Sequence, residues 1–117
     1  MKNILVPTDF SECANAASDY AIRLAGMIGA KVHFLNVQLT PVDWVRLPKD
    51  KEKLYPESIK AIGHAKSQLS KWHKDAEKKG VKAEKILILE IGDEQILKHI
   101  KSHFFDFIIM GSNGAKG

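Results

Sequence analysis

Three glycines spaced three residues apart, Gly111, Gly114 and Gly117, follow an apolar run near the end of the sequence. A glycine-rich loop lets backbone N–H groups approach a phosphate closely, because no Cβ atom stands in the way. Within this run, the Ser112 hydroxyl and the Asn113 amide could donate hydrogen bonds to phosphate oxygens. The same residue types also occur in ordinary turns from a strand into a helix. The run therefore predicts either a phosphate-binding loop or a simple turn.

A carboxylate, Asp9, follows the first apolar run of the chain, directly after Pro7 and Thr8. At the end of a strand this group could accept hydrogen bonds from a ribose or from the amine of adenine, or hold Mg²⁺ through water. Alternatively, Asp9 or Ser11 could cap the helix that follows. The residue type alone leaves both roles open.

The elements that would position these residues alternate between strand and helix along the chain. Short apolar runs predict strands at residues 3–6, 32–37, 82–89 and 106–110. Apolar residues at three- and four-residue spacing predict helices at about residues 11–28, 57–79 and 94–103, and the proline-containing segment 38–56 predicts a long loop. Such alternation predicts an α/β fold, with a parallel sheet in the order 3-2-1-4 and helices on both faces. Ligands bind to sheets of this class beyond the carboxyl ends of the strands.

Two segments together carry a family resemblance. Pro7-Thr8-Asp9-Phe10-Ser11 after the first strand and Gly111-Ser112-Asn113-Gly114 after the fourth resemble the universal stress protein family, and the resemblance covers the whole chain. ATP-binding members of that family carry G-x-x-G, nine residues, then G-[ST]. Gly111 and Gly114 match the first half of this motif. The second half would begin at position 124, beyond Gly117.

The resemblance implies a single doubly wound sheet of the adenine nucleotide alpha hydrolase-like type, with the family's last helix and fifth strand missing from this chain. It implies one domain over residues 1–117, incomplete at its C-terminal side. It also implies ATP, with or without Mg²⁺, bound in a stress-response or regulatory role, and a homodimer or a tandem partner domain. No Ser-His-Asp or Cys-His constellation can be placed at the strand ends from the sequence, so we expect no enzyme activity beyond slow ATP hydrolysis. The binding residues implied are Pro7, Thr8, Asp9, Val37, Met110, Gly111, Ser112, Asn113, Gly114 and Gly117.

Three alternatives remain at this point. A nucleotide-free interaction module would have the same fold, as some members of the family do. A phosphoryl-accepting receiver also shares the layout, but receivers carry an aspartate at the end of the third strand, where this chain has Glu90-Ile91-Gly92. His99 and His103 are four apart on a predicted helix and could bind zinc, but without an evident third ligand we expect no metal site.

Composition narrows the function further. The net charge is +4, but the lysines are interleaved with Asp and Glu, which is typical of a solvated face and not of a nucleic-acid surface. No apolar run approaches the roughly 20 residues that a membrane-spanning helix needs. The first apolar run is too short for a secretory signal, and the single cysteine, Cys13, fits a reducing compartment. We therefore expect a cytoplasmic protein that binds neither nucleic acid nor membrane.

Overall fold

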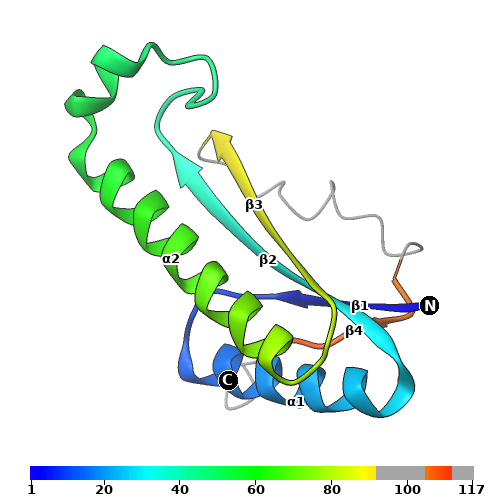
Figure 1. Cartoon of the computed structure of the whole chain (residues 1–117). Coiled ribbons are helices and arrows are strands. Elements are labelled where there is room, and N and C mark those ends of the chain that lie inside the picture. The colour runs from blue at the N-terminus through cyan, green and yellow to red at the C-terminus, as the bar shows by residue number, and fades with distance from the viewer. Residues whose placement is uncertain (92–104, 112–117) are drawn as a thin grey trace, which may run out of the picture.

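The computed structural model describes residues 1–91 and 105–111 (Figure 1). The elements follow one another as strand β1 (Lys2–Pro7), helix α1 (Glu12–Ile28), strand β2 (Ala30–Thr40), 3-10 helix η1 (Lys49–Leu54), helix α2 (Pro56–Lys78), strand β3 (Ala83–Ile91) and strand β4 (Phe107–Ile108). The helix predicted at residues 94–103 lies outside the described residues. The alternation of strand and helix predicted from the sequence is thus confirmed for the part of the chain that is described.

The four strands form one parallel sheet in the order β3-β2-β1-β4, as predicted. In the centre of the sheet, Leu5 of β1 pairs with His33 of β2 on one side and with Ile108 of β4 on the other. Hydrogen bonds extend the β1–β4 contact past the two residues of β4: Asp106 donates from its backbone N to the Asn3 carbonyl (2.8 Å), and Ile109 to the Leu5 carbonyl (2.9 Å). The segment after residue 104 is therefore held along β1.

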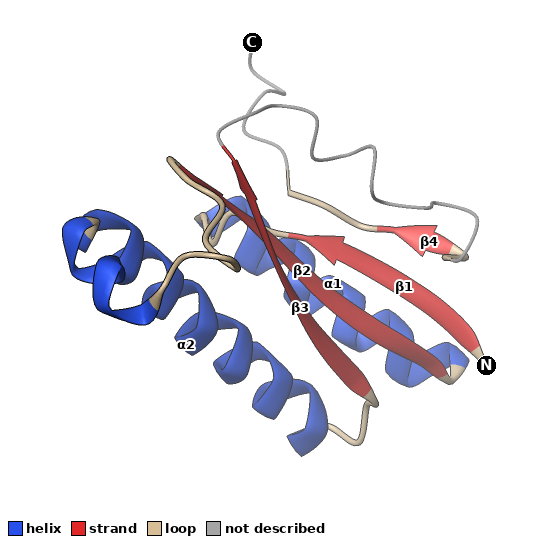
Figure 2. Ribbon diagram, turned by 90° about the horizontal axis from the view of Figure 1, so that it is seen from above, coloured by secondary structure: helices blue, strands red, loops and turns tan. Residues whose placement is uncertain are grey.

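Helices α1 and α2 lie on the same face of the sheet (Figure 2). The chain moves in one direction across the sheet from β1 to β2 to β3, and right-handed crossovers then place both connecting helices on one side. Strand β4 lies on the other side of β1, so the direction of winding reverses between β3 and β4. This reversal places the ligand-binding position of such sheets at the carboxyl ends of β1 and β4.

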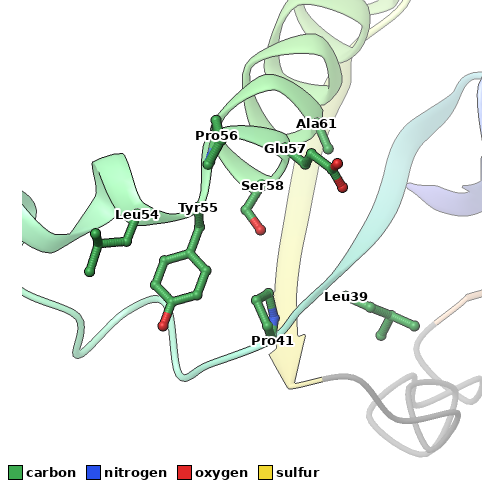
Figure 3. A pocket seen from close by; sticks show the side chains of 8 residues that line it. All are labelled: Leu39, Pro41, Leu54, Tyr55, Pro56, Glu57, Ser58 and Ala61. Carbon is green, nitrogen blue, oxygen red and sulfur yellow. The ribbon is translucent and has the colours of Figure 1, made fainter.

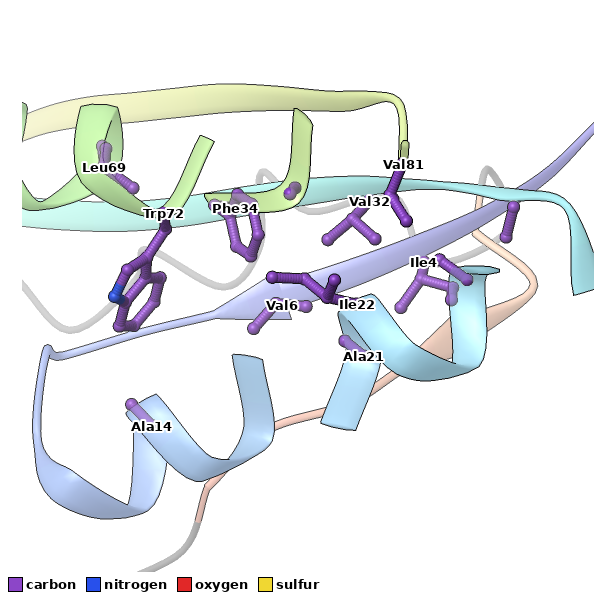
Figure 4. Packing of buried hydrophobic residues seen from close by; sticks show 13 residues of the cluster. Ile4, Val6, Ala14, Ala21, Ile22, Val32, Phe34, Leu69, Trp72 and Val81 are labelled. Atoms are coloured by element: carbon purple, nitrogen blue, oxygen red, sulfur yellow. The ribbon is translucent and has the colours of Figure 1, made fainter. Parts of the chain in front are cut away.

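The core fills the space between the sheet and these two helices (Figure 4). The strands contribute branched and aromatic side chains, α1 contributes small ones that allow a close approach, and α2 contributes Leu69 and Trp72. Phe34 of β2 is fully buried and its ring meets that of Trp72 edge to face, with centroids 5.6 Å apart. A buried side chain of this size stabilises the fold by about 1.5–3 kcal/mol. These contacts hold α2 against β2.

Several element boundaries differ from the prediction. Strand β2 continues past Val37 to Thr40, because its pairing with β3 continues as far as Thr40 opposite Ile91. The segment predicted as a loop contains η1, and α2 begins at Pro56, a residue whose fixed φ suits the first turn of a helix. Strand β4 is two residues long where five were predicted.

Candidate functional site

The turn after β1 is tied to β2 by hydrogen bonds on both sides of Thr8. The backbone N of Thr8 donates to the Leu35 carbonyl (2.8 Å), and the Thr8 carbonyl accepts from Nδ2 of Asn36 (2.8 Å). The Thr8 hydroxyl in turn accepts from the backbone N of Phe10 (2.9 Å). The turn that carries Asp9 is therefore a fixed structure with partners on both its backbone and its side chains.

Asp9 is exposed, and it does not cap α1. Its Oδ1 accepts from the backbone N of Ser11 (2.9 Å), while Ser11 itself is the N-cap and accepts from the backbone N of Ala14 through its hydroxyl (3.2 Å). Hydrogen bonds from the Ser11 hydroxyl and then from the Ser11 backbone lower the pKa of Asp9 below its ordinary value. The carboxylate is thus ionised, oriented and accessible to a ligand at neutral pH.

Gly111, the first glycine of the predicted loop, lies against the first turn of α1. A Cβ atom at this position would stand 2.3 Å from the carbonyl carbon and oxygen of Cys13 and 2.6 Å from the backbone N of Ala14. No side chain fits at such distances, so only glycine lets the chain pass here. This close approach brings the end of β4 beside the helix that Ser11 caps, which is the helix that follows Asp9.

The remaining site residues predicted from the sequence divide into two groups. Val37 is half-buried in β2, two residues beyond the Leu35 that pairs with Pro7, and Met110 is 60% exposed beside Gly111. The structure thus places Pro7, Thr8, Asp9, Met110 and Gly111 at the carboxyl ends of β1 and β4, while Val37 lies inside β2, three residues before its end at Thr40. The other four predicted residues, Ser112, Asn113, Gly114 and Gly117, lie outside the described residues.

Two residues of this region were missed from the sequence. Asn36 is buried, with 4% of its surface exposed, and joins β2 to the Thr8 carbonyl. Phe10 has a φ of 64°, in the left-handed region, and its ring meets those of His64 (5.7 Å between centroids) and Trp72 (5.6 Å). One signal was available for Asn36: an amide inside an apolar strand must find a hydrogen-bond partner.

A cavity of about 570 Å³ lies between the end of β2 and the beginning of α2 (Figure 3). Its lining is mixed: Leu39, Pro41, Leu54, Pro56 and Ala61 are apolar residues, and Tyr55, Glu57 and Ser58 are polar ones. None of the six predicted site residues that the structure describes lines it. Its volume is in the range of small-molecule sites, but it is separate from the turn that carries Asp9.

Within residues 1–91 and 105–111, no group of three or more His, Cys, Asp or Glu side chains is placed to hold a metal ion. In the same part of the chain, no helix has the length and apolar content that crossing a membrane requires.

This chain resembles known proteins in both sequence and structure. The model of the universal stress protein family matches residues 1–117. Universal stress protein MJ0531 of Methanocaldococcus jannaschii is 30% identical over 118 residues, which cover 99% of this chain and 67% of that protein. The structure of hypothetical protein MJ0577, solved to assign its biochemical function, has a TM-score of 0.70 at 31% identity and covers 99% of this chain and 78% of its own.

Two neighbours with the same fold hold adenine nucleotides. A universal stress protein family protein of Arabidopsis thaliana with AMP bound has a TM-score of 0.64 at 16% identity, over 98% of this chain and 79% of its own. A universal stress protein in complex with cAMP has a TM-score of 0.65 at 17% identity, over 92% and 74%. With the match of the family model to every residue and the related sequence from M. jannaschii, this chain belongs to the universal stress protein family.

Proposed function

We propose that this chain binds an adenine nucleotide, ATP, at the carboxyl ends of β1 and β4 and acts as a regulatory, non-catalytic domain. The observation that carries the proposal is that the oriented carboxylate of Asp9 comes just before the N-cap of α1, while the obligatory glycine at 111 lies against the first turn of the same helix. AMP and cAMP in two neighbours with the same fold support the choice of an adenine nucleotide.

The residues have separate roles in this proposal. Asp9 accepts hydrogen bonds from the adenine amine or from a ribose hydroxyl, and the main chain at Val37 borders the base. Met110 and Gly111 begin the loop that binds ribose and phosphates, to which we also assign Ser112, Asn113, Gly114 and Gly117. The phosphates themselves would hold Mg²⁺ if it binds, so no cluster of protein carboxylates is required.

Hydrolysis is a minor activity under this proposal. Catalysis of phosphoryl transfer depends on groups that position the nucleophile and stabilise the developing charge. Asp9 is the one carboxylate that we assign to the ligand, and it is assigned to the nucleoside end. Slow hydrolysis of ATP by bound water is therefore the most that we expect. In this proposal the protein is cytoplasmic, and the nucleotide controls its contact with a second copy or a tandem domain.

A second candidate function is a nucleotide-free interaction module, and exposed apolar side chains on β4 favour it. Phe107 and Ile108 are 42% and 45% exposed on a strand that is an edge of the described sheet, and Met110 is 60% exposed. Such an edge offers both backbone hydrogen bonds and apolar surface to another strand. The two functions are compatible if the nucleotide regulates the contact.

Calorimetric titration tests the proposal directly. The chain is titrated with ATP, AMP, GTP and pyrophosphate in one buffer at fixed ionic strength. We expect ATP and AMP to bind, and GTP to bind more weakly because a guanine presents a carbonyl where adenine presents the amine assigned to Asp9. No binding of any adenine nucleotide, together with self-association of the chain in light scattering, would leave the interaction module as the function.

A further inference from the structure

Asn36 uses both ends of its amide although it is buried. Its Nδ2 donates to the Thr8 carbonyl (2.8 Å), and its Oδ1 accepts from Nε2 of Gln38 (2.7 Å). Asn36 is 4% exposed, between two apolar residues, Leu35 and Val37, of β2. An amide in such a place is stable only while its hydrogen bonds are made. The Gln38 contact also fixes which way the Asn36 amide faces, since a donor from Gln38 requires the oxygen of Asn36 on that side.

Asn36 binds Thr8, the residue that directly follows β1. Pro7 is the last residue of β1 that pairs with β2, opposite Leu35, and the backbone N of Thr8 donates to the Leu35 carbonyl. The Thr8 carbonyl lies past the last pair between β1 and β2, and it accepts its hydrogen bond from the Asn36 side chain instead of from a backbone N–H. The carbonyl of Thr8 belongs to the peptide that joins Thr8 to Asp9, so this hydrogen bond fixes the plane of that peptide.

We propose that Asn36 is the positioning residue of the site: through the Thr8–Asp9 peptide it sets the place of the Asp9 carboxylate for the adenosine end of the ligand. The inference rests on the proposed function for the identity of the ligand. Gln38 supports the arrangement from the next position on the same face of β2. The Asn36 side chain contributes to recognition of the adenosine end only through Asp9. It does not contribute to phosphate binding, which we assign to the loop that begins at Gly111.

The test compares Asn36→Leu with a matched control, Thr40→Val. Thr40 is also buried in β2 at 2% exposure and donates from its hydroxyl to the Val42 carbonyl (2.7 Å), but it does not contact the turn after β1. Asn36→Leu loses the hydrogen bonds to the Thr8 carbonyl and from Gln38, and Thr40→Val loses a hydroxyl of the same strand that faces the carbonyls of Val42 and Glu90. We expect Asn36→Leu to bind ATP and AMP about tenfold more weakly and pyrophosphate unchanged, as the loss of one positioned hydrogen bond implies. Thr40→Val should change none of these affinities.

A double-mutant cycle with Asp9→Ala shows whether Asn36 acts through Asp9. If it does, Asn36→Leu weakens ATP binding in the wild-type background and has almost no further effect in the Asp9→Ala background. NMR titration of the Asp9 carboxyl adds a measurement that needs no nucleotide: the pKa of Asp9 should rise in Asn36→Leu and stay the same in Thr40→Val.

The outcomes separate the inference from the proposed function. A wild-type chain that binds no adenine nucleotide overturns the proposed function, and the NMR titration then decides whether Asn36 positions Asp9. A wild-type chain that binds ATP, with Asn36→Leu losing ATP and pyrophosphate equally or losing no more than Thr40→Val, overturns the inference and leaves the proposed function standing. Additive losses with Asp9→Ala overturn it as well.

Discussion

Gly111 and Cys13 approach so closely that a Cβ atom at residue 111 would lie 2.3 Å from both carbonyl atoms of Cys13. The contact joins the end of β4 to the first turn of α1, two segments that are almost a hundred residues apart in the sequence. Gly111 therefore has a steric role that is independent of any ligand. The residue that must be a glycine for steric reasons is thus also the first residue of the proposed phosphate loop.

Gly111→Ala should destabilise the fold, because the added methyl group meets backbone atoms that cannot move aside on their own. Overpacking of this kind costs about 1–3 kcal/mol. The matched control is Gly63→Ala within α2, where a Cβ atom would have no neighbour within 4 Å. This change should stabilise the chain by up to about 1 kcal/mol through helix propensity. Urea denaturation of both variants checks the expected opposite signs, and equal effects would contradict the close approach at Gly111.

Asp9→Ala should weaken ATP binding much more than pyrophosphate binding, because Asp9 is assigned to the nucleoside end of the ligand. A hydrogen bond to a charged group is worth about 1.5–3 kcal/mol, which corresponds to a loss of about tenfold to a hundredfold in affinity. Calorimetric titration of both ligands provides the measurement. Equal losses for ATP and pyrophosphate would show that Asp9 does not contact the nucleoside.

Sequence patterns predicted the parallel sheet and its order because each strand is a short apolar run and each helix has a regular apolar stripe. They also placed Asp9 and Gly111 at one edge, since both follow strands that are neighbours in that order. They could not decide between Asp9 and Ser11 as the helix cap, which depends on the local backbone, and the structure assigns the cap to Ser11. The role of Asn36 depends on a contact with Thr8 across 28 positions, which no local pattern contains.

The left-handed backbone of Phe10 predicts that a glycine at this position is more stable than an alanine, the reverse of the order seen at most positions. Its φ of 64° costs an L-residue about 1–2 kcal/mol, and its ring contacts with His64 and Trp72 offset that cost. Both Phe10→Ala and Phe10→Gly lose the ring contacts, but only glycine also loses the strain. We expect Phe10→Gly to be more stable than Phe10→Ala by about 1 kcal/mol in urea denaturation. A more stable alanine variant would mean that the turn abandons this conformation once the ring is removed.

The last prediction concerns pH and His33, which lies in the first half of β2, outside the set of residues proposed to bind the nucleotide. The Nε2 atom of His33 lies 3.0 Å from Oδ1 of Asn3, and its Nδ1 atom lies 3.9 Å from Oε1 of Glu84. The rings of His33 and Phe105 pack edge to face, with their centroids 5.2 Å apart. Burial lowers the pKa of His33 below its ordinary 6.5, with a smaller opposing effect of Glu84 and a further lowering by Lys31. The folded state thus favours the neutral imidazole, which can donate from Nε2 to Asn3.

The sign of the pH dependence follows from that shift. Where the unfolded chain binds more protons than the folded chain, the free energy of unfolding rises with pH. For His33 this window lies between its lowered pKa and about 6.5, so its contribution is fully present above pH 6.5 and is lost as the pH falls through the window. His33→Gln keeps a side-chain N–H for Asn3 but does not titrate. Urea denaturation between pH 5 and pH 8 should show a shallower decline in stability for His33→Gln than for the wild-type chain. Parallel profiles would show that the burial of His33 does not affect its protonation.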